Sequence, residues 1–370
     1  MNRNSSQGFD PIHNSKPLVA VFLVVAILLA ASFAMLFALH NDATHPKKEK
    51  DDDSLPAGSF FDDDNDSEDQ DDDNGNGTPI YVTVPSRNNY VSTRSSGVIN
   101  LTNEIKSQNT ILVDMDSYTS IVEKNADAKM YPASMTKVMT LLVICENATS
   151  LTKKLTVTEE MVKYKQENEG SGENFAAGEA LTVKDFIYLV IYDSNTIACQ
   201  ILAEHIAGSE SAFVAMMNAK AKELGLANTH FTNATGLYDE NHYSTCREMA
   251  AIMAYALDNP LAKTVLTSFN GYSIKVYDSD TGKEVRSLLV YTDWYSVRFK
   301  DNAKLKTVTV KGGKTGFVDE SGISLVSYAE TPDGKGYINV IVGQPAKSEN
   351  YVNASTSTSE VKYIYNNYVK

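Results

Sequence analysis

The chain has few cysteines and no cluster of side chains that would suggest a metal site. Its 370 residues include three cysteines, Cys145, Cys199 and Cys246, which are far apart in the sequence. There is no Cys-x-x-Cys pair and no cysteine–histidine cluster, so neither a metal nor another cofactor is expected. Cys145 and Cys199 lie in apolar stretches, where a free cysteine behaves as a small hydrophobic side chain. One disulfide with a thiol left over is the alternative.

The chain also lacks an excess of positive charge. Its formal net charge is −14, and residues 40–78 alone hold fourteen acidic residues against three lysines. The rest of the chain is close to neutral, so no electrostatic argument favours nucleic acid as a partner. No internal repeat is visible in the sequence.

One long hydrophobic run stands near the start of the chain. Residues 18–39, Leu18 to Leu39, are 22 residues without a charge and with one hydroxyl, Ser32. As a helix this run would extend about 33 Å, enough to cross a bilayer core of about 30 Å. It is longer than the apolar part of a cleavable signal peptide and has no good cleavage site after it. We therefore expect a single transmembrane anchor after a polar tail, 1–17; a cleaved signal is the alternative.

Composition divides the rest of the chain into two parts. Residues 40–98 are poor in apolar side chains and rich in Asp, Asn, Gly and Ser, which predicts a disordered acidic linker. We expect it to act as a spacer; cation or polymer binding by its Asp clusters is the alternative. Residues 99–370 are expected to form the folded domain.

The folded part shows strand patterns at both ends and helical patterns between them. Strands are predicted at 111–115, 120–123, 307–310, 323–328 and 337–342, and a closing helix at 359–370. Thr182 to Asp185 has the pattern of a capping box, Gly208 is typical of a helix end, and 209–224 predicts a further helix. This order favours an α+β fold, with an antiparallel sheet flanked by helices and a helical subdomain.

A serine and a lysine stand three residues apart at the start of one predicted helix. In Tyr131-Pro-Ala-Ser-Met-Thr-Lys-Val-Met-Thr140, Pro132 suits a first helical turn and places Ser134 and Lys137 on the same face. A hydroxyl beside an amine is the arrangement of a serine nucleophile with a lysine base. Most Ser-x-x-Lys matches are ordinary helix surface, so this motif alone predicts little.

Two further motifs follow in the chain. Lys314-Thr-Gly316 comes after an alternating strand, where its glycines indicate close approach of a ligand or backbone. It is not a phosphate loop, because no Gly-x-x-x-x-Gly-Lys-[Ser/Thr] pattern is present. Asp193-Ser194-Asn195 forms a polar break between two helical stretches, and the amide of Asn195 can both donate and accept.

Together these motifs resemble the serine-type D-Ala-D-Ala carboxypeptidases, the low-molecular-mass penicillin-binding proteins. The similarity covers about residues 99–370 and includes Leu202-Ala-Glu-His-Ile-Ala-Gly-Ser209 and Thr229-His-Phe-Thr-Asn-Ala-Thr-Gly-Leu237. It implies a β-lactamase/transpeptidase-like domain in which Ser134 is acylated and Lys137 is the base. It also implies that Lys314, Thr315 and Gly316 bind the substrate carboxylate, that Asn195 contacts the substrate, and that the N–H groups of Ser134 and Phe317 form an oxyanion hole.

One position departs from the family pattern. The family usually has Ser-x-Asn at the second motif, whereas here Asp193 takes the serine position and Ser194 the variable one. Either Asp193 takes over the polar role, or Ser194 reaches in from a shifted backbone. A carboxylate there would raise the pKa of Lys137 and oppose its use as a base.

The resemblance implies a bacterial enzyme, Gram-positive by expectation, held at the cell membrane with its catalytic domain outside. Its expected partners are peptidoglycan stem peptides ending in D-Ala-D-Ala and β-lactam antibiotics. A related β-lactamase or endopeptidase is one alternative, although no Glu-x-x-Leu-Asn element of class A β-lactamases is present. A non-catalytic wall-binding or β-lactam-binding module, suggested by Asp193, is another.

Overall fold

A computed structural model describes residues 78–268, 270–292, 304–344 and 354–370. The expected anchor, 18–39, and the acidic run before residue 78 lie outside these residues. Over the four described ranges, no helix combines the length and the apolar character needed to cross a membrane.

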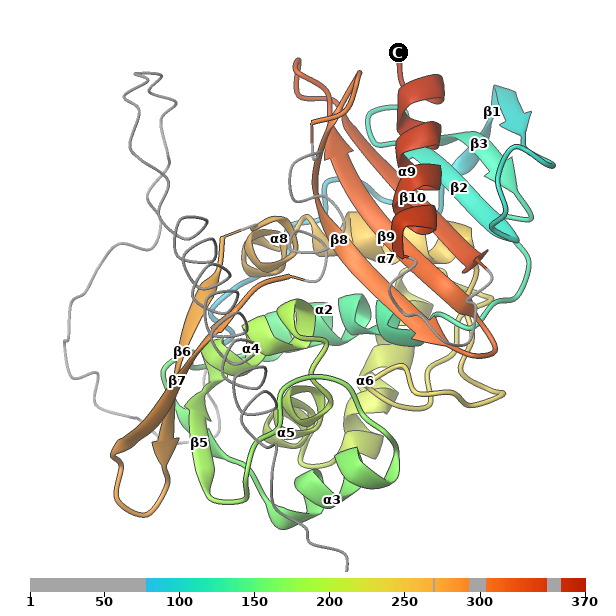
Figure 1. The fold of residues 1–370 in the computed structure, drawn as a ribbon. Helices are drawn as coiled ribbons and strands as arrows, with labels where there is room; N and C mark the ends of the chain where they lie inside the picture. The colour runs from blue at the N-terminus through green and yellow to red at the C-terminus, as the bar shows by residue number, and fades with distance from the viewer. Residues whose placement is uncertain (1–77, 269, 293–303, 345–353) are drawn as a thin grey trace, which may run out of the picture. The chain divides into compact units, whose positions relative to one another are not determined.

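A six-stranded sheet forms one half of the described fold (Figure 1). Its strands, in spatial order, are β1 (Thr93–Asn100), β3 (Thr119–Lys124), β2 (Asn109–Asp114), β10 (Gly336–Gln344), β9 (Gly322–Glu330) and β8 (Thr309–Val318). Every neighbouring pair is antiparallel except β1 and β3, which are parallel. Strand β10 lies directly beside β2, so strands from both ends of the folded chain share one sheet.

Helices cover both faces of this sheet. Figure 1 shows α9 (Ala354–Tyr368) across one face, with α7 (Cys246–Ala256) behind the other. On the α9 side, Ile364 and Tyr365 are buried in a small cluster with Leu325 and Ile341 of the sheet. On the α7 side, the sheet joins the main hydrophobic core of the helical half.

The helical half is built around α2 (Lys137–Asn147), of which residues 137–145 are all buried. A helix that is buried on every side must be apolar all round, and α2 is, apart from Lys137 and Thr140. The helices of this half are α3 (Glu159–Glu167), α4 (Val183–Tyr192), α5 (Thr196–Ala207), α6 (Glu210–Glu223) and α8 (Pro260–Thr267). The 3₁₀ turn η1 (Ala133–Thr136) leads directly into α2.

A second, four-stranded antiparallel sheet borders the helices (Figure 1). Its strands, in order, are β4 (Lys154–Thr156), β5 (Glu179–Thr182), β6 (Tyr272–Asp278) and β7 (Glu284–Val290). The sequence analysis did not predict the short strands β4 and β5.

The structure confirms the α+β class and the antiparallel core of the sheet. The capping box of Thr182 and Asp185 is present, and Gly208 ends α5 in a left-handed conformation. All three cysteines are buried and free. The closing helix begins at Ala354 rather than at residue 359. Residues 78–98 had been assigned to the linker, yet Tyr90 is buried and β1 begins at Thr93, so folded structure starts before residue 99.

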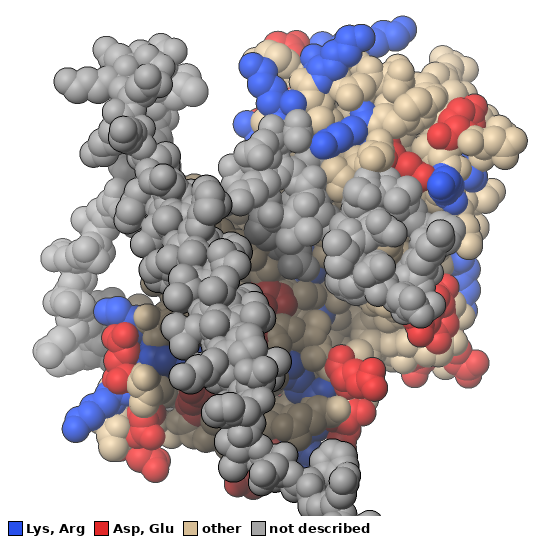
Figure 2. All heavy atoms as spheres, in the orientation of Figure 1, with Lys and Arg blue, Asp and Glu red and all other residues tan. Residues whose placement is uncertain are grey.

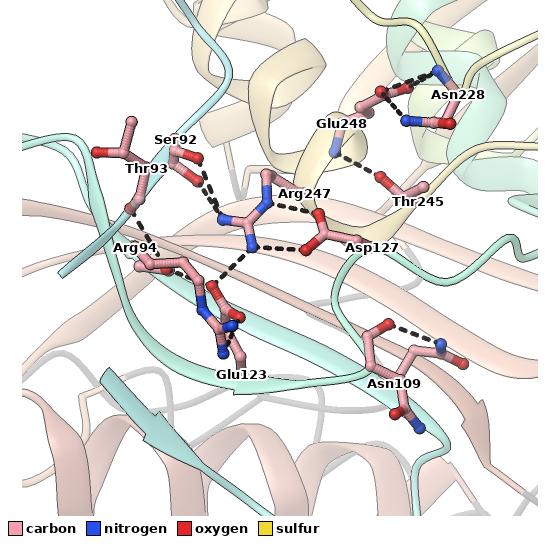
Figure 3. Close-up of polar contacts among 12 residues, drawn as sticks. Ser92, Thr93, Arg94, Asn109, Glu123, Asp127, Asn228, Thr245, Arg247 and Glu248 are labelled. Carbon is pink, nitrogen blue, oxygen red and sulfur yellow. Dashed lines mark hydrogen bonds and ion pairs between the residues drawn. The ribbon is translucent and has the colours of Figure 1, made fainter. Parts of the chain in front are cut away.

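A buried arginine joins the segment that precedes β1, residues 78–92, to the rest of the domain (Figure 3). The guanidinium of Arg247, on α7, donates to Glu123 at 2.7 Å, to Asp127 at 2.6 and 2.9 Å, and to the carbonyl of Ser92 at 3.1 Å. Glu123 is also buried, and its second oxygen contacts Arg94 at 2.9 Å. The carboxylates on either side raise the pKa of Arg247 against the opposing effect of its burial.

We expect Arg247→Met to lower the free energy of unfolding by about 3–5 kcal/mol, because it leaves the carboxylate of Glu123 buried with one cation fewer. Urea unfolding at neutral pH measures the loss. Arg94→Met is the matched control: the Arg94 side chain is 53% exposed, and its loss should cost less than about 1 kcal/mol. Equal effects of the two substitutions would contradict this account.

Candidate active site

A cleft of about 390 Å³ lies where β8 and η1 meet the helical half. Seven of the nine predicted site residues line it, and Asn195 and Lys314 do not. The lining residues are Ser134, Lys137, Glu169, Ser171, Gly172, Asp193, Ser194, Thr196, Thr235, Gly236, Leu237, Thr315, Gly316, Phe317 and Val318.

Ser134 lies on the 3₁₀ turn η1, one turn before the α-helix in which the sequence placed it. Pro132 caps this turn, and Ala133, between the two, has a left-handed backbone with φ 48°. A non-glycine residue in this region costs about 1–2 kcal/mol, and such strain clusters at functional sites. The strained turn positions Ser134 ahead of the rigid helix α2.

The ammonium of Lys137 is in contact with the Ser134 hydroxyl. Nζ of Lys137 lies 3.1 Å from Oγ of Ser134 and donates to the carbonyl of Thr235 at 2.6 Å. Burial lowers the pKa of Lys137, while the charges of Cys199 and Asp193 act in the opposite direction. The predicted opposition from Asp193 is therefore present, but desolvation outweighs it.

Two glycines pack against the backbone next to Ser134, Gly236 from a neighbouring turn and Gly316 from the third motif. A Cβ on Gly236 would lie 1.9 Å from the carbonyl oxygen of Ala133, and one on Gly316 would lie 2.9 Å from that of Pro132 and 3.1 Å from the Ser134 nitrogen. The turn is thus packed directly between the chain at 236 and strand β8. This close approach explains the need for glycine in Lys314-Thr-Gly316.

A turn that the sequence analysis did not assign to the site supplies the partner of Lys137. Oδ1 of Asn233 accepts from the backbone N–H groups of Thr235 and Gly236 at 3.2 and 2.7 Å and from the Thr235 hydroxyl at 3.0 Å. These bonds fix the Thr235 carbonyl that faces Lys137. The Asn-x-Thr-Gly sequence is a turn signal of the kind in which an asparagine side chain bonds its own backbone, and it could have indicated this feature.

The third motif lies within strand β8, not after the strand as predicted. Thr315, Gly316 and Phe317 line the cleft, whereas Lys314 is buried and its Nζ donates to the Thr315 carbonyl at 3.1 Å. The charges of both Lys137 and Lys314 lower the pKa of Cys199 against the larger effect of its burial, so the two ammonium groups lie near the same thiol.

In the second motif, the structure turns Asn195 away from the cleft. Asn195 is fully buried and caps α5: its Oδ1 accepts from the Ala198 N–H, and its Nδ2 donates to Asp193 and to the carbonyl of Glu173. Its polar atoms are therefore all used inside the protein. Ser194 and Thr196, on either side of it, line the cleft instead.

Asp193 is bonded to a neighbouring loop and not to either lysine of the motifs. Its Oδ2 accepts from the N–H of Glu173 at 2.5 Å and from Nδ2 of Asn195 at 2.8 Å. Burial raises the pKa of Asp193, and these hydrogen bonds act in the opposite direction. The polar stretch 166–173, whose position the sequence could not indicate, contributes Glu169, Ser171 and Gly172 to the cleft wall.

A buried histidine supports the turn that carries Ser134. Nε2 of His242 lies 2.8 Å from the hydroxyl of Thr136, and its Nδ1 accepts from the N–H of Thr232 at 3.1 Å. Because Nδ1 accepts, Nε2 carries the proton and donates to Thr136. Burial lowers the pKa of His242 to about 4, so the ring is neutral at pH 7.

The surface of the domain carries side chains of both charges. On the face in Figure 2, lysines and arginines gather at the upper end over the sheet, whereas acidic and basic side chains are mixed over the helical part. Among the described residues, no group of three His, Cys, Asp or Glu side chains is close enough to hold a metal ion. The chemistry that this cleft offers is thus that of a hydroxyl, a buried amine and backbone donors.

Comparison with known proteins agrees with this geometry. The chain belongs to the peptidase S11 family, whose model, described as D-alanyl-D-alanine carboxypeptidase, matches residues 96–346. Over 230 residues it is 35% identical to the D-alanyl-D-alanine carboxypeptidase DacF of Bacillus subtilis. That alignment covers 62% of this chain and 55% of the relative, so the chain spans only about half the length of this protein.

Solved structures share the fold. A point variant of the Streptomyces K15 DD-transpeptidase superposes with a TM-score of 0.62 at 25% identity, covering 72% of this chain and 99% of that one. Penicillin-binding protein 5 from Haemophilus influenzae superposes with a TM-score of 0.59 at 26% identity, covering 72% of each chain. The transpeptidase-like fold that the sequence predicted is therefore confirmed.

We expect Gly236→Ala to destabilise the protein by roughly 2–5 kcal/mol, because a methyl group must displace the Ala133 carbonyl and also occupy a left-handed backbone. Thermal or urea unfolding measures it. Gly208→Ala is the matched control, since Gly208 has a similar φ of 78° and nothing within 4 Å of its Cβ position. It should lose only about 1–2 kcal/mol. Equal losses at the two glycines would show that packing against Ser134 is unimportant.

We expect His242 to make the folded protein less stable in mild acid. The unfolded chain takes up a proton near pH 6.5, whereas the folded chain does so only near pH 4. The unfolded state therefore binds more protons between these values, and stability falls as pH falls from 6.5 toward 4, by about 2 kcal/mol at pH 5. Urea unfolding at pH 7 and pH 5 tests this. A His242→Gln variant should lose that part of the pH dependence, and an unchanged pH dependence would contradict the assignment.

Proposed function

We propose that this protein is a serine-type D-alanyl-D-alanine carboxypeptidase that removes the terminal D-alanine of peptidoglycan stem peptides. The observation that carries the proposal is the contact of 3.1 Å between a buried Lys137 amine and the hydroxyl of Ser134, at the floor of an open cleft. Membership of the S11 family and the similarity to a protein named as a D-alanyl-D-alanine carboxypeptidase support the same reaction.

In the proposed acylation step, Oγ of Ser134 attacks the carbonyl carbon of the peptide bond between the two D-alanines. The neutral amine of Lys137 takes the hydroxyl proton, and the bond to the terminal D-alanine breaks to leave an ester on Ser134. The reaction needs a neutral lysine near physiological pH, and burial moves the pKa of Lys137 in that direction. The Thr235 carbonyl keeps the amine oriented toward Ser134.

The roles of the third motif follow from its position beside η1. Thr315 at the cleft wall, with the ammonium of Lys314 beneath it, would bind the terminal carboxylate by hydrogen bond and charge. The N–H groups of Ser134 and Phe317 would donate to the carbonyl oxygen as it becomes negative. The Gly316 contact with the η1 backbone supports this role, because it brings strand and turn together.

In the second motif, we assign the hydroxyl to Ser194 and not to Asp193. Ser194 and Thr196 line the cleft while Asn195 is consumed by internal hydrogen bonds. In this register Ser194 holds the family's serine position and Thr196 stands where the family has asparagine. The hydroxyl of Ser194 would pass a proton to the departing amine, and Thr196 would take the substrate contact expected of Asn195.

Hydrolysis of the Ser134 ester by water completes the proposed cycle. Acylation by β-lactams follows from the same chemistry, because their ring carbonyl would occupy the position of the scissile peptide, and the name of the structural neighbour from Haemophilus influenzae supports it. The likeness to a DD-transpeptidase favours a second candidate outcome, in which an amine of another peptide resolves the ester in place of water.

The cellular setting is proposed from sequence alone. Residues 18–39 would anchor the chain in the bacterial cell membrane, with 40–77 as an acidic spacer and the catalytic domain outside. This places the cleft where peptidoglycan is found.

We expect Ser134→Ala to abolish acylation, and Lys137→Arg to reduce it by at least about 1000-fold, because a guanidinium stays protonated and cannot act as a base. Mass spectrometry after incubation with penicillin measures the adduct, and a D-alanine assay measures release from a D-Ala-D-Ala peptide. The acylation rate of the unaltered protein should rise with pH through the lowered pKa of Lys137.

The same two assays separate the alternatives. Release of D-alanine together with a slowly hydrolysed penicillin adduct supports a carboxypeptidase. Rapid turnover of penicillin would indicate a β-lactamase, and an adduct without release would indicate a binding module. Normal acylation of Lys137→Arg would overturn the assignment of the base.

A further inference from the structure

A loop of residues 169–174 is packed directly on the second motif. A Cβ on Gly172 would lie 2.6 Å from the Asn195 Cα, and one on Gly170 would lie 2.7 Å from the Thr196 hydroxyl. The backbones of loop and motif therefore approach as closely as glycine allows. Loop 169–174 therefore forms one wall of the cleft and also supports the second motif, against which it packs.

Ser171 of this loop bonds to the backbone that directly follows the Ser194 side chain. Its hydroxyl donates to the carbonyl of Ser194 at 2.5 Å, and its own carbonyl accepts from the N–H of Thr196 at 3.1 Å. These are the polar groups of the chain leaving Ser194. Their geometry is thus set by the loop.

Ser194 needs such support because its backbone is strained. Its φ is 52°, a left-handed conformation that costs a serine about 1–2 kcal/mol. Its hydroxyl is buried at the cleft and has no hydrogen-bond partner among the residues that the structure describes. Released from the loop, this residue would relax to an ordinary conformation, and the hydroxyl would move away from its place beside the cleft.

Two oppositely charged residues hold the loop in place. The ammonium of Lys165, on α3, is 5% exposed; it donates to the carbonyls of Gly172 and Glu173 and to Oδ1 of Asn174. From the other side, Asp193 accepts from the N–H of Glu173. Lys165 thereby uses its three donors on three consecutive residues, and it does not itself line the cleft.

A third contact closes the far end of the loop. Arg286, on β7, pairs with the Glu173 carboxylate at 3.1 Å and donates to the Asn174 carbonyl at 2.9 Å. Arg286 is about one-third exposed, so this contact is weaker than that of the buried Lys165.

We infer that Lys165 and Asp193 are positioning residues for catalysis: they clamp loop 169–174 against the second motif and so hold the Ser194 hydroxyl at the reaction centre. The inference rests on the proposed function, since it assigns the clamp a role in acylation of Ser134. It gives Asp193 a purpose other than replacing the serine of the motif, and it makes Lys165 a determinant of the reaction rate without contact with the substrate.

The test compares Lys165→Met with Lys163→Met, a lysine on the same helix that is 72% exposed and pairs with Glu167. We expect Lys165→Met to lower the second-order rate of acylation by a fluorescent penicillin by about 10- to 100-fold, since displacement of a group by about 1 Å has that effect. Lys163→Met should acylate at the normal rate. Normal acylation of Lys165→Met would overturn the clamp.

A double-mutant cycle separates positioning from a general loss of structure. If Lys165 acts through the Ser194 hydroxyl, Ser194→Ala should slow acylation, and adding Lys165→Met should slow it little further. Independent, multiplicative effects on the rate, or normal acylation of Ser194→Ala, would refute the inference. A fall in melting temperature alone would be the same in both backgrounds and would not produce this coupling.

Asp193→Asn is the second variant if Lys165→Met folds poorly. It keeps the size and one acceptor oxygen but loses the charge that faces Lys165, so a smaller loss, about 3- to 10-fold, is expected, again absent in the Ser194→Ala background. An unchanged rate would count against the clamp. Failure of the unaltered protein to form any adduct on Ser134 would instead refute the proposed function.

Discussion

The site depends on keeping the amine of one lysine out of water. Lys137 begins helix α2, of which residues 137–145 are all buried, and desolvation is the largest influence on its pKa. A buried ammonium is costly unless it is bonded or loses its proton, and among the described residues its hydrogen-bond partners are the Thr235 carbonyl and the Ser134 hydroxyl. The packing of α2 within the helical half therefore both stabilises the fold and lowers the pKa of Lys137.

The rest of the cleft is organised by backbone contacts made possible by missing side chains. Gly236 and Gly316 press on the turn before Ser134, and Gly170 and Gly172 press on the second motif. Interiors are packed closely enough that a single added methyl group at such points must displace backbone. The three catalytic segments come from distant parts of the chain, and these contacts set their spacing more tightly than side-chain pairs could.

The sequence was most informative where local signals and chemistry coincide. The strands at 111–115 and 120–123, the capping box at Thr182 and the helix end at Gly208 were predicted because each depends on a few neighbouring residues. The pairing of Ser134 with Lys137 was likewise visible from their spacing. The parallel pairing of β1 with β3 could not be predicted, because parallel strands are not joined by a hairpin turn that the sequence would show. The short strands β4 and β5 carry too few residues to show alternation.

The direction of side chains in the second motif could not be read from residue identity. Asn195 was expected at the substrate and is instead a helix cap, because asparagine is equally suited to either use. What decides between them is the left-handed backbone at Ser194, which the loop 169–174 stabilises. Such a conformation is a tertiary effect, and a shift of a single residue reverses which side chains reach the cleft.

The attachment of the N-terminal segment has a mechanical consequence. The chain entering the domain is fixed to its surface in series: Ile80 to the Ala148 carbonyl, Thr83 to Asn259, and Tyr90 to Asp258. Farther along the chain, Ser92 is bonded to Arg247, and β1 then pairs in parallel with β3. Under tension, β1 would have to shear past β3 and could not separate from it one hydrogen bond at a time. A pull transmitted along residues 40–77 would thus be borne by the edge of the large sheet. The catalytic cleft, at β8 on the opposite edge of that sheet, would be shielded from the load.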